Sequence, residues 1–207
     1  MTASIKLKRN GPQTAAHCLV LAHGAGAPMD SPFMEYFAKQ LAQAGIRVVR
    51  FEFPYMAKRR ETGKKSPPDR LPKLEASWLD VIGRVSGQRI VIGGKSMGGR
   101  VASLVADEAQ VSGLVCLGYP FHPVGKPDRL RTEHLQDFKT PTLIVQGERD
   151  VFGNASEVPR YRLSDSVELC WVPDGDHSFK PRKSSGHTEA ENLAMAAEAV
   201  TQFVRSL

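Results

Sequence analysis

The chain has 207 residues, of which 41% are hydrophobic and 24% are charged, and its formal net charge is +6. This length suits one domain with a substantial buried core, and the composition is typical of a globular protein and excludes a disordered one. No apolar run approaches the roughly 18 residues that a membrane span needs, and the first residues lack the apolar region of a signal peptide, so we expect one cytoplasmic domain over 1–207 with no membrane partner.

Short apolar runs alternate along the chain with longer segments of helical period. The opening SIKLKR, residues 4–9, alternates apolar and polar side chains, which predicts an edge strand. The other predicted strands are apolar almost throughout, which is typical of parallel strands that are covered on both faces. They are residues 18–22, 46–53, 89–93, 113–118, 141–147 and 167–172.

Helical segments lie between and after these strands. They are predicted at residues 32–45, 75–86, 97–109 and 188–207. Asp30 or Ser31 is a candidate cap for the first, Pro32 suits its first turn, and Thr188 with Glu191 forms a candidate capping box for the last. This alternation predicts a three-layer, doubly wound α/β fold with a mostly parallel sheet of six to seven strands, whose active crevice lies at the carboxyl ends of the strands.

Residues 54–74 contain four prolines and are predicted to form a loop or small flap. The positive charge of the chain is concentrated there, because residues 58–73, KRRETGKKSPPDRLPK, hold seven Lys or Arg against two acidic residues. A solvated surface loop is the simplest interpretation, and attraction of an anionic substrate or an acidic partner is the alternative. The absence of aromatic residues within 58–73 argues against a nucleic-acid partner.

The cysteines and histidines give no sign of a metal site. Cys18, Cys116 and Cys170 each lie in an apolar, strand-like run and are interpreted as small buried hydrophobic residues. No pair of His, Cys or carboxylate residues has the spacing of a closed metal site, so we expect no metal.

The stretch Gly94-Lys95-Ser96-Met97-Gly98 fits the pattern G-x-S-x-G, directly after a predicted strand and before a predicted helix. A sharp turn from strand to helix exposes the hydroxyl of Ser96, and the two glycines let neighbouring backbone approach. A phosphate-binding loop is the competing interpretation, but Arg89 stands where that motif needs its first glycine. Lys95 is either a residue that attracts carboxylates or an ordinary exposed lysine.

A serine nucleophile needs a base and an acid that orients the base. Asp150 follows the predicted strand 141–147, and His177 follows the strand 167–172, so both side chains reach the edge where Ser96 emerges. Glu148 is the alternative to Asp150. Acyl transfer also needs donors for the oxyanion, and the backbone N–H groups of Ala25 and Met97 are the candidate pair.

The loop after the first core strand, LAHGAGAP, contributes Ala25, and we expect His23 in it to support the loop by hydrogen bonding. The stretches HGAGAPMDSPFM, GGKSMGGR, GERD and DGDHSF resemble the α/β-hydrolase superfamily, and in particular its small capless members akin to dienelactone hydrolases. They are also similar to the hydrolase-like group that includes the non-specific-lethal complex subunit and its testis-expressed relative. The resemblance implies the α/β-hydrolase fold, the order nucleophile, acid, base for Ser96, Asp150 and His177, and the oxyanion site.

The segment at about 118–140 is too short for the helical lid that many esterases insert, so we expect an open, shallow acyl pocket. Tyr119, Phe121 and His122 either line this pocket or pack beneath a loop. The leading hypothesis is a cofactor-free serine hydrolase of a small ester, thioester or similar acyl compound. The alternative is a non-catalytic module that binds a partner through residues 58–73.

Overall fold

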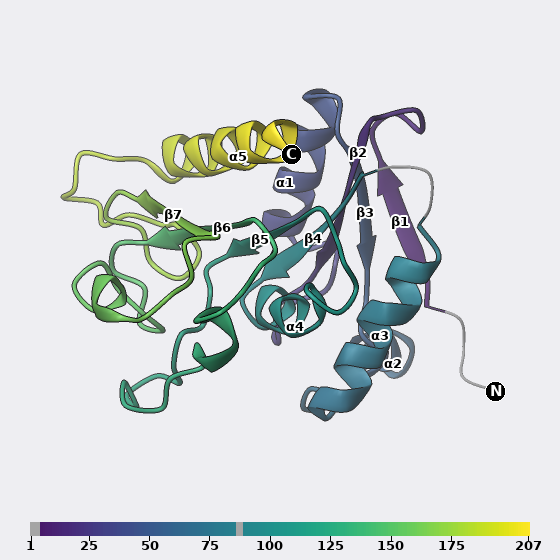
Figure 1. Ribbon diagram of the computed structural model, residues 1–207, viewed down its shortest axis with the longest axis horizontal. Helices are drawn as coiled ribbons and strands as arrows, with labels where there is room; N and C mark the ends of the chain where they lie inside the picture. The colour runs from purple at the N-terminus through teal and green to yellow at the C-terminus, as the bar shows by residue number, and fades with distance from the viewer. Residues whose placement is uncertain (1–4, 86–88) are drawn as a thin grey trace.

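A mostly parallel β-sheet runs through the centre of the computed structural model, which describes residues 5–85 and 89–207 (Figure 1). Within these residues seven strands form the sheet, in the order β1-β3-β2-β4-β5-β6-β7. They are β1 (Leu7–Asn10), β2 (His17–Ala22), β3 (Arg47–Phe51), β4 (Arg89–Lys95), β5 (Gly113–Leu117), β6 (Thr142–Gly147) and β7 (Val167–Val172). β1 is antiparallel to β3 at one edge and the other pairs are parallel, which confirms the predicted doubly wound sheet and its edge strand.

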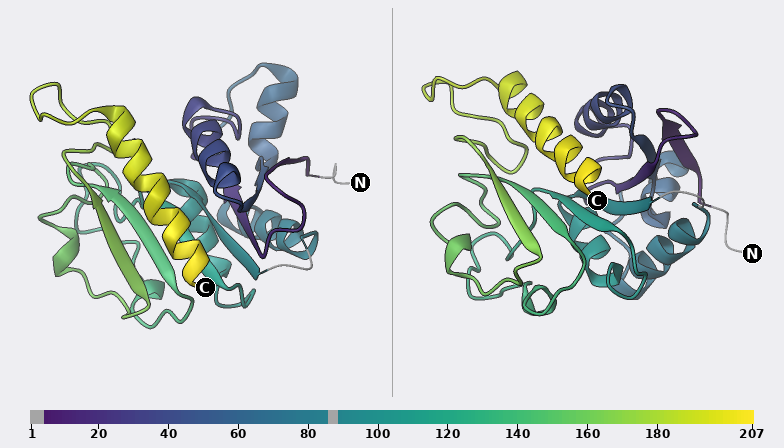
Figure 2. Two further views of the ribbon diagram at one scale, coloured as in Figure 1. Left: turned by 90° about the horizontal axis from the view of Figure 1, so that it is seen from above. Right: turned by 45° about the horizontal axis from the view of Figure 1, so that its top comes forward.

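Helices cover both faces of the sheet and complete the predicted three layers (Figures 1 and 2). The helices are α1 (Pro32–Gln43), α2 (Pro54–Thr62), α3 (Leu71–Gly83), α4 (Met97–Val105) and α5 (Glu189–Ser206). α1 and α5 pack on one face over one apolar cluster, and α3 and α4 pack with α2 on the other face over a second cluster. The apolar strands are therefore buried from both sides, which explains why they show no alternation.

The sequence predicts N-terminal caps for α1 and α5, and the structure shows a side-chain capping hydrogen bond only at α5. At α5 the candidate capping box is confirmed, because Thr188 Oγ1 accepts from the Glu191 N–H at 3.2 Å and Glu191 Oε2 accepts from the Thr188 N–H at 2.8 Å. At α1 the N-cap is Ser31, but its side chain makes no capping hydrogen bond. Asp30, the other candidate cap, instead accepts a hydrogen bond from Arg60 at 2.8 Å.

The prediction of a loop or flap at residues 54–74 is correct only for residues 63–70, because helices form on both sides of them. Two of its four prolines start helices: Pro54 opens α2, and Pro72 lies in the first turn of α3. Proline fits there because the first helical N–H groups have no intrahelical acceptor. Tyr55 and Met56 of α2 are buried in the core, so packing stabilises a helix whose composition is strongly basic. α3 likewise begins at Leu71, before the predicted 75.

The chain between β5 and β6 forms turns and one short 3-10 helix, Glu133–Leu135, and in the described part of the chain no lid domain is inserted there. Cys18 and Cys116 are buried in the sheet, as predicted, whereas Cys170 is only partly buried. None of the helices in the described ranges is both long and apolar enough to cross a bilayer.

Candidate active site

Ser96 sits at the turn between β4 and α4. Its backbone has φ 51° and ψ −115°, a strained conformation that L residues rarely adopt. This strain is what the glycine-rich stretch predicted, because the chain must turn sharply from a central strand into a helix. The turn lifts the serine side chain to the carboxyl end of the sheet, where it is only partly buried.

Gly94 lets the elbow lie directly against the neighbouring strand β2. A Cβ atom at Gly94 would lie 2.2 Å from the carbonyl oxygen of Ala22, and one at Gly98 would lie 2.6 Å from the same atom. Both contacts are with backbone, which cannot move without breaking the pairing of β2 and β4. The two glycines of G-x-S-x-G are therefore required by packing.

We expect Gly94→Ala to lower the free energy of unfolding by about 3 kcal/mol or more, because the clash lies in the middle of the sheet. The measurement is the urea midpoint of the variant against the wild type. Gly83→Ala is the matched control, because a Cβ atom at Gly83 meets nothing within 4 Å. Equal midpoints for the two variants would contradict this account of the elbow.

Ser96, His177 and Asp150 are joined by hydrogen bonds. His177 Nε2 lies 2.9 Å from Ser96 Oγ, and His177 Nδ1 lies 2.7 Å from Asp150 Oδ2. Because a carboxylate only accepts, Nδ1 is the donor to Asp150, and in a neutral imidazole Nε2 is then free to accept from the serine hydroxyl. The structure thus brings together three residues that follow three different strands, β4, β6 and β7.

Asp150, and not Glu148, contacts the imidazole. Asp150 is fully buried, and its Oδ1 accepts a hydrogen bond from the Phe152 N–H at 2.9 Å. Glu148 instead accepts from the Asp174 N–H at 2.8 Å and so holds the turn that leads to His177.

Gln146 is a supporting residue that the sequence analysis missed. It is fully buried, and its Nε2 donates to Asp150 Oδ2 at 3.0 Å and to the Gly153 carbonyl at 2.9 Å. Its Oε1 accepts from the Tyr119 N–H at 2.7 Å. The only signal in the sequence is a polar residue inside an apolar strand, which does not reveal its partners.

The loop that contains Ala25 is braced by α2. Tyr55 Oη donates to the Ala25 carbonyl at 3.0 Å, and Arg59 Nη1 donates to the Gly26 carbonyl at 3.2 Å. His23 is buried and supports the loop as predicted, since its Nε2 accepts from the Phe53 N–H at 3.1 Å and its Nδ1 lies 2.7 Å from the Gly24 carbonyl oxygen. Burial lowers the pKa of His23, which agrees with a neutral ring.

The two candidate oxyanion donors belong to segments that adjoin the cavity in front of Ser96. Met97 is the first residue of α4, where the N–H has no intrahelical acceptor, and it follows Ser96 directly. The same cavity is lined by Ala25, Ser96 and His177. The Ala25 N–H shares its peptide plane with the Gly24 carbonyl, whose oxygen lies 2.7 Å from His23 Nδ1.

A cavity of about 680 Å³ lies in front of Ser96 and His177. Much of its wall is apolar and comes from the loop after β2, from α1, from Phe152 and from the start of α5. These lining residues include Ala25, Ala27, Phe33, Met34, Tyr36, Phe152 and Leu193. Phe152 also packs on the imidazole, with 4.5 Å between the centroids of its ring and that of His177.

Tyr119, Phe121 and His122, the candidate substrate-binding residues, are not among the residues that line this cavity. They are at most 3% exposed and pack beneath a loop, because the chain turns inward after β5. The Tyr119 and Phe121 rings pack against each other in a tilted arrangement, with their centroids 4.9 Å apart, and His122 Nε2 lies 3.2 Å from Glu157 Oε2. The structure therefore corrects the prediction that they line the pocket in favour of its alternative.

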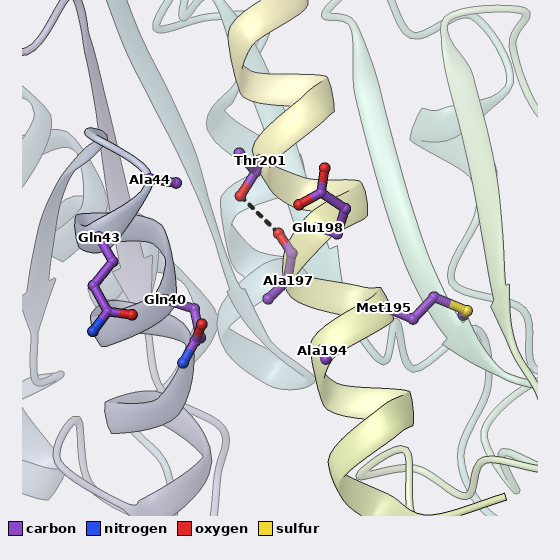
Figure 3. Close-up of a pocket in the computed structure, with 8 residues that line it drawn as sticks. All are labelled: Gln40, Gln43, Ala44, Ala194, Met195, Ala197, Glu198 and Thr201. Atoms are coloured by element: carbon purple, nitrogen blue, oxygen red, sulfur yellow. Dashed lines mark hydrogen bonds between the residues drawn. The ribbon is translucent and has the colours of Figure 1, made fainter.

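A second hollow, of about 570 Å³, lies between α1 and α5 (Figure 3). Its walls are formed by Gln40, Gln43, Ala44, Ala194, Met195, Ala197, Glu198 and Thr201. Figure 3 shows that the Thr201 hydroxyl is directed back to its own helix, where it donates to the Ala197 carbonyl at 2.8 Å. Among the residues that line this hollow there is no histidine or cysteine.

Several charges of the basic segment 58–73 are engaged in ion pairs within the fold. Arg60 pairs with Glu52 at 2.6 Å and with Asp30 at 2.8 Å, and Lys73 pairs with Asp69 at 2.7 Å. The chain that joins α2 to α3 is exposed. Among the residues described, no group of three His, Cys, Asp or Glu side chains is arranged to hold a metal ion.

Known proteins resemble this chain in sequence and in fold. The "Putative protein-lysine deacylase ABHD14B" of Rattus norvegicus is 30% identical over 132 residues, a match that covers 60% of this chain and 60% of that protein. A serine hydrolase without lid from Xanthomonas campestris superposes with a TM-score of 0.73 at 21% identity, over 98% of this chain and 88% of that one. A dienelactone hydrolase from Anabaena variabilis superposes with a TM-score of 0.69 at 20% identity, over 100% of this chain and 94% of that one.

These structures confirm the predicted likeness to capless, dienelactone-hydrolase-like folds, whereas the likeness to the non-specific-lethal and testis-expressed group stays a prediction. Residues 15–205 match the family described as the alpha/beta hydrolase domain, which is most of the chain. The protein therefore belongs to the α/β-hydrolase family.

Proposed function

We propose that the protein is a serine hydrolase that cleaves a small ester, thioester or related acyl compound through an acyl-enzyme. The observation that supports this most is the pair of hydrogen bonds from His177 to Ser96 and Asp150, at 2.9 and 2.7 Å. A serine side chain in a strained turn, in contact with a neutral ring nitrogen, has the geometry of an activated nucleophile. The apolar wall of the cavity suits an acyl chain.

The proposed reaction has two steps. Ser96 Oγ attacks the acyl carbonyl carbon while its proton moves to His177 Nε2, and the carbonyl oxygen becomes an oxyanion facing the N–H groups of Ala25 and Met97. His177 then donates that proton to the leaving group. In the second step His177 removes a proton from water, the hydroxide attacks the acyl carbon, and the carboxylic product leaves as Ser96 recovers its proton.

The role of Asp150 in this scheme is to hold the ring of His177 and to stabilise its positive form. Each step uses side chains and backbone groups of the chain itself, so the proposal needs no cofactor. The ABHD14B relative is named as a putative deacylase, and removal of an acyl group by water is the same class of reaction. A small acyl compound is accordingly the partner that we propose for the cavity.

The proposal is tested by labelling with a fluorophosphonate, which reacts with activated serines. We expect the folded protein to be labelled, the label to map by mass spectrometry to the peptide that contains Ser96, and prior denaturation to abolish the reaction. A panel of p-nitrophenyl esters of increasing chain length then defines the acyl group. A folded protein that is neither labelled nor active on any ester would contradict the proposal.

A further inference from the structure

Lys95 lies at the end of β4, next to Ser96, and its ammonium group is turned into the protein. The residue is partly buried and lines the cavity in front of Ser96. Its Nζ lies 5.1 Å from the centre of the Phe33 ring on α1 and 5.6 Å from that of Phe179. Both distances are within the range of a cation–π contact, so the ammonium is held in one place.

The Nζ of Lys95 donates a hydrogen bond to the backbone carbonyl of His177. The meeting point is cleared by Gly118, at the end of β5, which has φ +70°. A Cβ atom at Gly118 would lie 2.8 Å from Lys95 Nζ and 2.9 Å from the His177 carbonyl oxygen. Residues at the ends of β4 and β5 and in the loop after β7 therefore meet at this one contact.

The other fixed points of the His177 loop come from elsewhere. Asn192 of α5 donates through its Nδ2 to the carbonyls of Pro173 and Phe179, both at 2.9 Å. Asp176 accepts from the backbone of its own turn, at Ser178 and at Lys180. Lys95 differs from them because it belongs to the strand that carries Ser96, so it joins the nucleophile's strand directly to the base's loop.

We propose that Lys95 is a positioning residue, which holds the His177 loop to the end of β4 and so sets the contact between His177 Nε2 and Ser96 Oγ. The inference rests on the proposed hydrolase function and deepens it. Lys95 acts through the backbone of His177, so its removal changes the rate of proton transfer more than the binding of substrate.

The charge of Lys95 is part of this role. The charged and titratable groups that face it are Asp150 after β6 and Asp176 and His177 after β7, whereas α1 presents the neutral Phe33. Burial of the ammonium lowers the pKa of Lys95 to about 8, although the two carboxylates favour the charged form. Above this pH Lys95 becomes a neutral amine, which is a weaker donor and makes no cation–π contact.

The test compares Lys95→Met with Lys180→Met, a control that removes the same charge from an exposed position in the His177 loop. We expect Lys95→Met to lower kcat for ester hydrolysis by about 10- to 100-fold with KM changed by less than about 3-fold, because the hydrogen bond from the charged donor to the His177 carbonyl is lost while methionine keeps an apolar stem in the cavity wall. Lys180→Met keeps the wild-type values. Lys95→Gln, which retains an N–H donor, is expected to recover part of kcat. If Lys95→Met does not fold, Lys95→Gln is compared with the wild type and with Lys180→Met in its place.

The pH profile separates positioning by a charged group from a purely structural role. We expect kcat of the wild type to fall as the pH rises through about 8, where Lys95 loses its proton. In Lys95→Gln this alkaline limb disappears, because the glutamine does not titrate. A wild type whose kcat does not fall above pH 8, or a Lys95→Met variant with wild-type kcat, overturns the inference.

The fluorophosphonate separates this inference from the function on which it rests. Labelling of Ser96 in the wild type together with equally fast labelling of Lys95→Met overturns the role of Lys95 alone. A folded wild type that is not labelled overturns the proposed function and this role with it. Slower labelling of Lys95→Met than of the wild type and Lys180→Met supports both.

Discussion

Replacement of Ser96 with alanine is expected to lower kcat for ester hydrolysis by about 10⁴- to 10⁶-fold, the range seen when the nucleophile of a Ser-His-Asp site is removed. The physical reason is that, among the hydrogen bonds of the described residues, Ser96 provides the one hydroxyl that contacts His177 Nε2, at 2.9 Å. The activity that remains reflects water held in the site and the oxyanion donors.

The same substitution is expected to leave the fold intact. The side-chain oxygen of Ser96 contacts His177 at the surface of the cavity, and alanine keeps the Cβ atom and the same backbone demand at φ 51°. Thermal unfolding therefore serves as the check that lost activity is not lost structure. Ser66→Ala, at an exposed position between α2 and α3, is the matched control and is expected to retain full activity. Comparable activity of the two variants would rule out Ser96 as the nucleophile.

The sheet and the convergence of Ser96, Asp150 and His177 are predictable because the signals are local and the geometry is general. Apolar runs identify parallel strands, and parallel strands bring their carboxyl ends to one edge of the sheet. A polar residue one to five positions beyond such a strand therefore lies along this edge, near residues that follow the neighbouring strands. The spacing of G-x-S-x-G adds the one sharp turn that the general rule lacks.

The supports of these residues are not predictable in the same way. Gln146 is one polar residue in an apolar strand, and its role depends on Asp150 and Gly153 folding back beside it. The contact of Lys95 with the His177 carbonyl joins residues 82 positions apart and needs the open space at Gly118. Such contacts arise from tertiary packing, and a local pattern does not contain them.

α2 was missed for a different reason. The helix is basic and the residues that follow it are rich in proline, and both features favour a loop. Tyr55 and Met56, however, are buried against the core and supply the packing that a short helix needs. The consequence for the site is direct, because Tyr55 and Arg59 of this helix hold the loop of Ala25 and Gly26. Part of a segment that the sequence predicts to be a loop or small flap is therefore a support of the candidate oxyanion site.

Replacement of Asp150 with asparagine is expected to lower kcat by about 10³- to 10⁴-fold with little change of volume. Oδ2 of Asp150 accepts from both His177 Nδ1 and Gln146 Nε2, while Oδ1 accepts from the Phe152 N–H. A side-chain amide has only one oxygen, so it can accept the hydrogen bonds made at Oδ1 or those made at Oδ2, but not both. If the amide oxygen takes the place of Oδ1, the NH2 group faces His177 Nδ1, and the imidazole takes the tautomer that cannot accept from Ser96. If it takes the place of Oδ2, the NH2 group faces the Phe152 N–H, and two donors meet. In both cases the negative charge that stabilises the positive imidazole is gone.

The matched control is Glu148→Gln, because Glu148 is the other acid that the sequence offers after β6. Its carboxylate accepts from the Asp174 N–H at 2.8 Å, and the carbonyl oxygen of a glutamine accepts that hydrogen bond equally well. We therefore expect Glu148→Gln to change kcat by less than about 10-fold, since it leaves His177 and its partners in place. A larger loss for Glu148→Gln than for Asp150→Asn would transfer the orienting role to Glu148, and it would require the loop after β6 to rearrange so that Glu148 reaches His177 Nδ1.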